Sequence, residues 1–216
     1  MAPDKFLGQT KYTMSARVYD AISAEWPVYR AGRIAAVEML RLQPGMKVLD
    51  IGCGTGLNLP LVIRKIGPHG VYVGLDRSPE MLEEAQRKAS RQELRNVSLL
   101  EADATEVRSD ELTHAIDGTA FDAVIATYAL SLMREPRAGF EVAVAASRSG
   151  ARIAVADMQL PNGLARVFAP IARLACYLGG ADITARPWTL VEERCVDVEA
   201  ASFRGGHIQV RAGTVD

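Results

Sequence analysis

The sequence predicts an α/β fold, in which helices precede a doubly wound, mostly parallel sheet of seven strands that ends in an antiparallel hairpin. Three observations support this prediction. Between residues 46 and 157, short apolar runs alternate with helical patterns five times, as in parallel strands joined by helices on both faces of a sheet. A glycine-rich loop follows the first of these runs. Near the end of the chain, two further strand patterns meet at Gly205 and Gly206.

Composition narrows the possible functions. The 216 residues suit a single compact domain with a substantial core. A net charge of −1 disfavours a nucleic-acid partner, which would require a basic surface. The three scattered cysteines have neither metal-ligand nor disulfide spacing, and they favour a reducing compartment. Because no signal-peptide core or long apolar run occurs, we expect a soluble, cytoplasmic protein. No metal is expected, because metal-ligand clusters are not evident in the sequence.

Residues 1–44 are expected to form a helical segment ahead of the first strand, and residues 45–216 the main domain. Helical patterns cover 15–24 and 29–42, and Trp26-Pro27 separates them. Aromatic side chains are concentrated in this segment, at Tyr12, Tyr19, Trp26 and Tyr29. Plain packing on the core and contact with a ligand both remain open for them.

The glycine-rich loop is the strongest functional signal. The apolar strand pattern at 46–51 ends next to Asp50, and Gly52, Gly54 and Gly56 follow before a helical pattern begins. Glycines let a ligand approach the main chain, and the free N–H groups of the helix point to the same place. A dinucleotide fingerprint would need glycine where Leu57 stands, so a nicotinamide-dependent oxidoreductase is less favoured. Asp50 would repel an anion, but through water it could bind a ligand that carries an ammonium and a sulfonium.

Later strands also end in polar residues. Asp76 closes the strand 71–76 at the distance from the loop where this fold places an acid on ribose hydroxyls. Ser78 is the expected cap of helix 79–92. Asp103 follows strand 97–101, and either ligand binding or helix capping would explain it. Strand 121–127 leads into Tyr128, which places that residue where ligands bind in parallel sheets.

The remaining pattern predicts a helix at 135–148 ended by Gly150, a strand at 151–157, and an apolar helix at 164–178. That apolar helix has two interpretations: core or cap, or else a lid for an apolar substrate or a membrane-surface contact. The chain then continues as a short helix from 189 to 193 and two strands. These strands cover 196–203 and 207–212.

Four short motifs resemble those of the class I S-adenosylmethionine-dependent methyltransferases. They are the strings from Val48 to Gly56, Gly74 to Leu82 and Ala102 to Thr105, and the end of the strand at Thr127. The resemblance implies a Rossmann-like methyltransferase fold, an N-terminal lid, and S-adenosylmethionine as cofactor, with S-adenosylhomocysteine as product. The cofactor-binding residues that it implies are Tyr12, Asp50, Gly52, Gly54, Gly56, Asp76, Arg77, Met81, Asp103, Ala104 and Thr127. Tyr19 and Tyr128 would lie at the transferred methyl group as catalytic residues.

A finer resemblance concerns the acceptor. Tyr19-Asp20, the string from Gly54 to Pro60, and Tyr128 to Met133 resemble the small bacterial lipid-amine N-methyltransferases of the phosphatidylethanolamine type. They resemble the ubiquinone and menaquinone C-methyltransferases less closely. His69 and His207 are expected to have structural roles, so no clear base is found, which favours an amine acceptor.

Several alternatives stay open. The chain could methylate carbon or oxygen of a quinone or natural product, or bind S-adenosylmethionine without turnover. The expected partner is a small or lipid-like molecule rather than a nucleic acid. Weak peripheral membrane contact and the oligomeric state are left open.

Overall fold

The computed structural model describes residues 28–216 as one sheet flanked by helices. The strands are β1 Lys47–Ile51, β2 Val71–Asp76, β3 Val97–Glu101, β4 Phe121–Thr127, β5 Ser147–Met158, β6 Cys195–Phe203 and β7 Ile208–Val215. The α-helices are α2 Arg30–Met39, α3 Leu59–Ile66, α4 Pro79–Arg91, α5 Ser109–His114, α6 Pro136–Ala146, α7 Ala169–Gly179 and α8 Thr189–Arg194. Two 3₁₀ helices, η3 Leu130–Leu132 and η4 Gly163–Phe168, complete the order.

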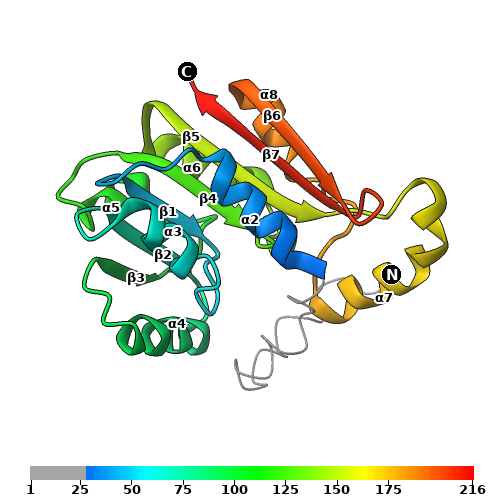
Figure 1. Cartoon of the computed structure of the whole chain (residues 1–216), viewed down its shortest axis with the longest axis horizontal. Helices are drawn as coiled ribbons and strands as arrows, with labels where there is room; N and C mark the ends of the chain where they lie inside the picture. Colours follow the sequence, from blue (N-terminus) through cyan, green and yellow to red (C-terminus); the bar gives the residue numbers. More distant parts are fainter. Residues whose placement is uncertain (1–27) are drawn as a thin grey trace.

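The sheet has seven strands in the order β3-β2-β1-β4-β5-β7-β6 (Figure 1). Strands β1 to β5 pair in parallel, whereas β7 runs antiparallel to both β5 and β6. The chain builds outward from β1 to β3 and then returns to place β4 on the other side of β1. The predicted doubly wound fold with its terminal antiparallel hairpin is confirmed, and the order of strands reverses between β1 and β4.

Apolar side chains fill both faces of the sheet. Consecutive strand residues point to opposite faces, so Val48 belongs to one cluster and Leu49 to the other. One cluster packs under α5, α6 and α8, and includes Phe121 and Phe140. The other packs under α2 and α3, and includes Leu40. Burial on both faces explains why β1 and β4 are almost continuously apolar.

Two helix ends follow directly from the sequence. Ser78 caps α4 as predicted, because its Oγ accepts a hydrogen bond from the Met81 N–H at 3.3 Å and Pro79 stands in the first turn. Helix α3 ends at Gly67, which has a φ of 66°.

The predicted boundaries differ from the structure in several places: the last strand, predicted to end at residue 212, continues to Val215, and three further differences have a local cause. The apolar segment 164–178 is not one helix: η4 precedes α7, because Pro170 has no N–H to continue a helical ladder and fits only the first turn of α7. Strand β5 begins at Ser147, which pairs with Phe121, and Gly150 bends it at a φ of 75° instead of ending a helix. Helix α2 ends at Met39 because Arg41 takes a φ of 54° ahead of Pro44.

Helix α2 lies across the sheet and contacts β4, β5, β6 and β7 (Figure 1). The predicted helix at 15–24, together with Tyr12, Tyr19 and Trp26, lies outside the described residues. The division at residue 44 and the lid stay predictions. Within residues 28–216, the helices are all too short or too polar to cross a bilayer.

Candidate cofactor and acceptor site

Those predicted site residues that fall within residues 28–216 lie at or after the carboxyl ends of β1, β2, β3 and β4, whereas Tyr12 and Tyr19 lie outside the described residues. This edge includes the point where the strand order reverses, at which parallel α/β sheets bind their ligands. Asp76 and Glu101 are register partners at the ends of β2 and β3, so the loops after these strands leave the sheet side by side. The edge therefore brings the glycine loop together with the loops that carry Asp76 and Asp103.

The three glycines of the loop have different roles, although each has a positive φ. A Cβ on Gly52 would lie 2.4 Å from the Ala129 Cβ, and one on Gly56 would lie 3.2 Å from the Ala85 Cβ. These two glycines let the loop pack against its neighbours. A Cβ on Gly54 would meet no atom within 4 Å. Gly54 thus presents bare backbone to open space, which is the cradle that a ligand lying on the main chain requires.

Asp76 is fixed beside that cradle. Its Oδ2 accepts a hydrogen bond from the Gly54 N–H at 2.8 Å, and its Oδ1 accepts one from the Ser78 N–H at 2.9 Å. Burial raises the pKa of Asp76 in spite of these two bonds, which favour the ionised form. Each carboxylate oxygen can accept a further hydrogen bond, so the geometry fits the hydroxyls of a ribose.

Asp103 is held by a local turn. Its Oδ1 accepts from the Thr105 N–H at 2.8 Å and from the Thr105 hydroxyl at 2.7 Å. Partial burial opposes ionisation, but these bonds and the charge of Arg77 outweigh it and lower the pKa of Asp103. Arg77, which follows Asp76, is exposed, whereas Ala104, which follows Asp103, and Met81, in the first turn of α4, are buried. The Asp103 carboxylate fits an adenine amino group as acceptor.

Asp50 lies beneath the loop and has no exposed surface. Its carboxylate accepts from Asn58 Nδ2 at 3.0 and 2.9 Å and from the Tyr72 hydroxyl at 2.6 Å. Burial raises the pKa of Asp50 to about 6, against the opposing effects of Tyr72, Asn58 and Arg33. In this structure Asp50 holds the start of α3 through Asn58, the helix whose N-terminus follows the loop. Its contact with a cofactor stays a prediction.

Arg33 ties α2 to this buried network. One of its guanidinium nitrogens donates to Asn58 Oδ1 at 2.8 Å and to the Thr127 hydroxyl at 2.6 Å. None of Arg33, Asn58 and Tyr72 was predicted from the sequence to be a site residue. Asn58 could have been found from its position within the glycine motif. Arg33 could not, because an arginine in an amphipathic helix looks like part of the solvated face.

Tyr128 has an unusual backbone conformation at the end of β4. Its φ is 57°, which is uncommon for an aromatic residue, and it is held by a hydrogen bond from its N–H to the Ala156 carbonyl at 2.8 Å. Its phenol donates to the Tyr29 carbonyl at 2.7 Å, and the two rings lie 4.8 Å apart. The Arg33 guanidinium lies 5.5 Å from the Tyr128 ring centroid. This strained residue links strand β4 to the beginning of α2.

The aromatic cluster extends to the end of β5. The Tyr29 ring lies 6.3 Å from the His207 ring, and His207 Nδ1 lies 2.5 Å from the Gln159 carbonyl oxygen. A hydrogen bond to a carbonyl requires Nδ1 to be protonated, so a neutral ring carries its lone pair on Nε2. The bond to Gln159 fits the structural role expected for His207, and the hairpin also places the ring beside Tyr29 at the carboxyl edge of the sheet.

Asp157, which is buried near the end of β5, anchors the segment that follows β4 through Ser131. It accepts from the Ser131 hydroxyl at 2.7 Å, the Ser131 N–H at 3.1 Å and the Met158 N–H at 2.9 Å. Burial raises the pKa of Asp157 to about 6. The described residues contain no cluster of three histidine, cysteine or acidic side chains able to hold a metal.

Comparisons with known proteins agree with this architecture. The model of a family described as methyltransferase domain matches residues 42–187. Aklanonic acid methyltransferase DauC of Streptomyces sp. is 33% identical over 119 residues, which are 55% of this chain and 50% of that protein. Arsenite methyltransferase of Halobacterium salinarum is 29% identical over 118 residues, or 54% of this chain and 28% of that one. The chain spans half or less of the length of these relatives.

A solved structure covers nearly all of the fold. The crystal structure of a SAM-dependent methyltransferase from Aquifex aeolicus superposes with a TM-score of 0.61 at 16% identity, and covers 91% of this chain and 98% of that one. At this identity the likeness concerns the fold. Together with the family match over residues 42–187, it shows that the chain belongs to the methyltransferase domain family and has the fold of the class I S-adenosylmethionine-dependent methyltransferases.

Proposed function

We propose that this protein transfers the methyl group of S-adenosylmethionine to a small-molecule or lipid-like acceptor. The observation that supports this most is the open cradle at Gly54, whose N–H is bonded to the carboxylate of Asp76 at the reversal point of the sheet. When bound there, the cofactor supplies a methyl group already activated by a sulfonium. The protein then has to align the acceptor and exclude water, and alignment alone can contribute about 7–11 kcal/mol to catalysis.

Among the described residues, a different group would bind each part of the cofactor. Gly52, Gly54 and Gly56 would bind the amino-acid portion along the backbone. Asp76 would accept from the ribose hydroxyls, and Asp103 from the adenine amino group. The other cofactor contacts that we propose from the sequence are those of Tyr12, Asp50, Arg77, Met81, Ala104 and Thr127.

The acceptor site that we propose is formed by Tyr29, Tyr128 and His207. These side chains border the carboxyl ends of β4 and β5, next to Thr127. Tyr128 would touch the acceptor as a catalytic residue, because its strained backbone directs the ring into this region. Tyr19, proposed for the same role, lies outside the described residues.

Two kinds of acceptor atom remain candidates. An amine nitrogen was favoured because no base was evident, and a neutral amine needs none. His207 now favours the alternative of an oxygen or carbon acceptor, since its Nε2 can take a proton while Gln159 holds Nδ1. Aklanonic acid and arsenite methyltransferases act on different molecules by name, so these relatives do not choose between the candidates.

A paired substitution tests the cofactor site. Gly54→Val should abolish binding of S-adenosylmethionine in calorimetry, because the new side chain fills the open space at the cradle. Gly118→Val is the matched control. Gly118 also has a positive φ and open space, but it lies between α5 and the beginning of β4, away from the carboxyl edge of the sheet. The control should bind as the wild type does. Equal affinity of both variants, or no binding by the wild type at millimolar ligand, would refute the proposal.

Turnover separates an enzyme from a non-catalytic binding protein. The protein would be incubated with S-adenosylmethionine labelled on the methyl group and with polar and lipid fractions of a cell extract. We expect label in a small-molecule or lipid product. Binding without label in any fraction would instead support a non-catalytic role.

A further inference from the structure

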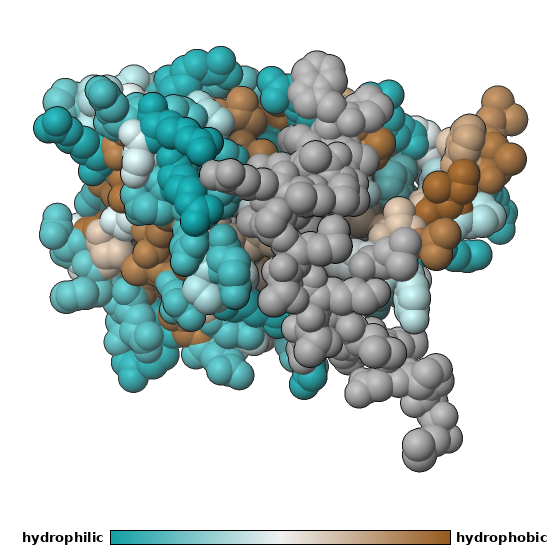
Figure 2. Space-filling model, turned by 90° about the horizontal axis from the view of Figure 1, so that it is seen from below, coloured by the Kyte–Doolittle hydropathy of each residue, from teal (hydrophilic) through white to brown (hydrophobic). Residues whose placement is uncertain are grey.

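Segment 163–179, which comprises η4 and α7, exposes more large apolar surface than any other part of residues 28–216. Six of its side chains are between 58% and 99% exposed, and we call them the apolar face: Leu164, Val167, Phe168, Ile171, Leu174 and Tyr177. The segment projects from the sheet, and in Figure 2 it forms the hydrophobic group at the far right. A contiguous apolar surface of this kind indicates an interaction site.

Helix α7 is apolar on opposite sides. Ala169 and Cys176 are buried toward the protein, while Ile171 and Leu174 lie on the other side of the helix and face solvent. Arg173 is the only charged residue in α7. A helix that is hydrophobic all round is normally enclosed by protein or lipid, so the outer side of α7 requires an apolar environment.

The charge of the segment around the apolar face distinguishes between the two partners that could cover it, a second copy of the chain and a lipid bilayer. From Met158 to Ala181 the sequence contains Arg166 and Arg173, both exposed, and no aspartate or glutamate. Two copies that met through this face would bring like charges together. An anionic bilayer instead offers lipid tails to the apolar side chains and negative headgroups to the arginines, and the rings of Phe168 and Tyr177 suit the boundary between them.

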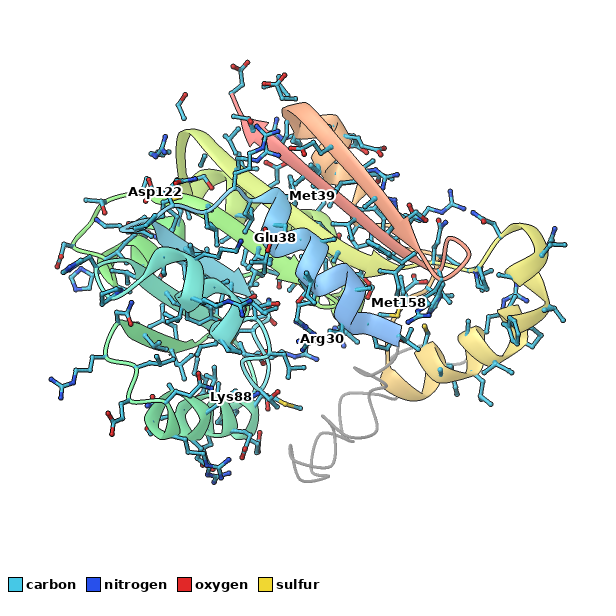
Figure 3. All side chains as sticks on the ribbon, in the orientation of Figure 1. Arg30, Glu38, Met39, Lys88, Asp122 and Met158 are labelled. Carbon is cyan, nitrogen blue, oxygen red and sulfur yellow. The ribbon has the colours of Figure 1, made fainter. Side chains whose placement is uncertain are left out.

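The apolar face also lies near the proposed acceptor site. The Cys176 thiol contacts Met158 Sδ at 3.2 Å, and the Tyr29 hydroxyl lies 4.0 Å from the same sulfur. Figure 3 shows Met158 between the beginning of α2 and the ribbon of α7. A molecule that leaves a bilayer under α7 would therefore arrive at the edge of the sheet that holds Tyr29 and His207.

We infer that the apolar face docks on the surface of an anionic lipid bilayer, so that a membrane-resident acceptor reaches the site from the lipid side. The inference deepens the proposed lipid-like acceptor and rests on it for its function. Binding to vesicles itself needs neither cofactor nor turnover, so a failure of docking and a failure of methyl transfer are observed in separate experiments.

The test is sedimentation of the full chain with vesicles of phosphatidylcholine, with and without phosphatidylglycerol. We expect the protein to sediment with the anionic vesicles and to be released by high salt. Ile171→Asp should weaken binding at least tenfold. Val196→Asp is the matched control, because Val196 is an exposed valine of β6 outside the apolar face, and this variant should bind as the wild type does.

Several outcomes would overturn the inference. They are an absence of vesicle binding, equal binding of Ile171→Asp and wild type, or equal binding to vesicles with and without phosphatidylglycerol. Light scattering after gel filtration provides a further check on what covers the apolar face. If the wild type is a dimer that Ile171→Asp converts to a monomer, a second copy of the chain covers the face. If the wild type is a monomer that does not bind vesicles, another part of the same chain covers it. Thermal unfolding of each variant confirms that it is folded.

Discussion

The phenol oxygen of Tyr128 occupies the space that a side chain at position 32 would need. A Cβ on Gly32 would lie 2.3 Å from Tyr128 Oη and 2.5 Å from Ile208 Cγ2. The absence of a side chain in this turn of α2 is therefore what lets the Tyr128 hydroxyl reach the Tyr29 carbonyl. Helix α2 and the end of β4 are joined at this contact.

Gly32→Ala should accordingly separate α2 from Tyr128. We expect a loss of about 1–3 kcal/mol in the free energy of unfolding, as for overpacking of a close contact, together with reduced methyl transfer. Gly179→Ala is the control, since a Cβ there meets nothing within 4 Å in another helix. Chemical denaturation measures both variants, and an equally stable Gly32→Ala protein would contradict this account of the contact.

Asp76→Asn should weaken S-adenosylmethionine binding by roughly 10- to 100-fold. The amide keeps one acceptor oxygen, so it loses either the Gly54 or the Ser78 hydrogen bond as well as the charge that favours ribose hydroxyls. A charge-assisted hydrogen bond contributes about 1.5–3 kcal/mol, which corresponds to this range. Calorimetry measures the affinity. Asp110→Asn, an exposed acid of α5, should leave it unchanged, and unaltered binding by Asp76→Asn would argue against the ribose assignment.

Arg33→Met should destabilise the fold and weaken cofactor binding together. The substitution leaves Asn58 Oδ1 and the Thr127 hydroxyl without their buried charged donor. Removing one member of such a buried network typically costs about 3 kcal/mol. Arg64→Met, an exposed residue of α3, is the control. Denaturation and calorimetry would be run on both variants, and a change in neither quantity for Arg33→Met would show that the network does not support the loop.

Local patterns were enough to predict most of the fold. The alternation of apolar runs placed β2, β3 and β4 at the residues where the structure has them, because each is bounded by a turn or cap visible in the sequence. The boundary between α6 and β5 was missed for a tertiary reason. The string from Ser147 to Gly150 looks like a helix end, and only its pairing with β4 makes it a strand.

The site was predictable only in part, because some of it is assembled across distant segments. Asp76 is the last residue of β2 and Asp103 follows the end of β3, and the carboxyl ends of parallel strands meet at one edge of the sheet. Arg33 reaches the buried network because of the way in which α2 is rotated about its own axis on the sheet. The amphipathic spacing of the helix alone does not predict that rotation. His207 depends on a contact with Gln159 across 48 residues, and the pairing of β5 with β7 creates it.

Stability should fall as pH rises from about 4 to 7, in part because of Asp157. Burial raises the pKa of this acid from an ordinary 3.8 to about 6 in the folded state, so folding favours the protonated form. Its contribution is fully present below the unfolded value and is lost as pH rises through about 6, by about 3 kcal/mol in total. Asp157→Asn should flatten the decline in urea unfolding over this range, although Asp50 continues to titrate there.

Asp117→Asn, an exposed acid after α5, serves as the control for this experiment and should reproduce the wild-type curve. Parallel curves for Asp157→Asn and wild type would mean that Asp157 is ionised in the folded protein without penalty. The hydrogen bonds from Ser131 and Met158 would then outweigh the burial.

His207→Gln tests the chemistry of the acceptor. Glutamine can still bond the Gln159 carbonyl but cannot take up a proton near neutral pH. If the acceptor is an oxygen or carbon that must lose a proton, the rate of methyl transfer should fall by about 10²–10⁴-fold, and added imidazole should restore part of that rate. His69→Gln, in an exposed turn, should leave the rate unchanged. A His207→Gln enzyme with the wild-type rate would exclude His207 as the base and leave the amine acceptor as the remaining candidate, because a neutral amine attacks the sulfonium methyl without help.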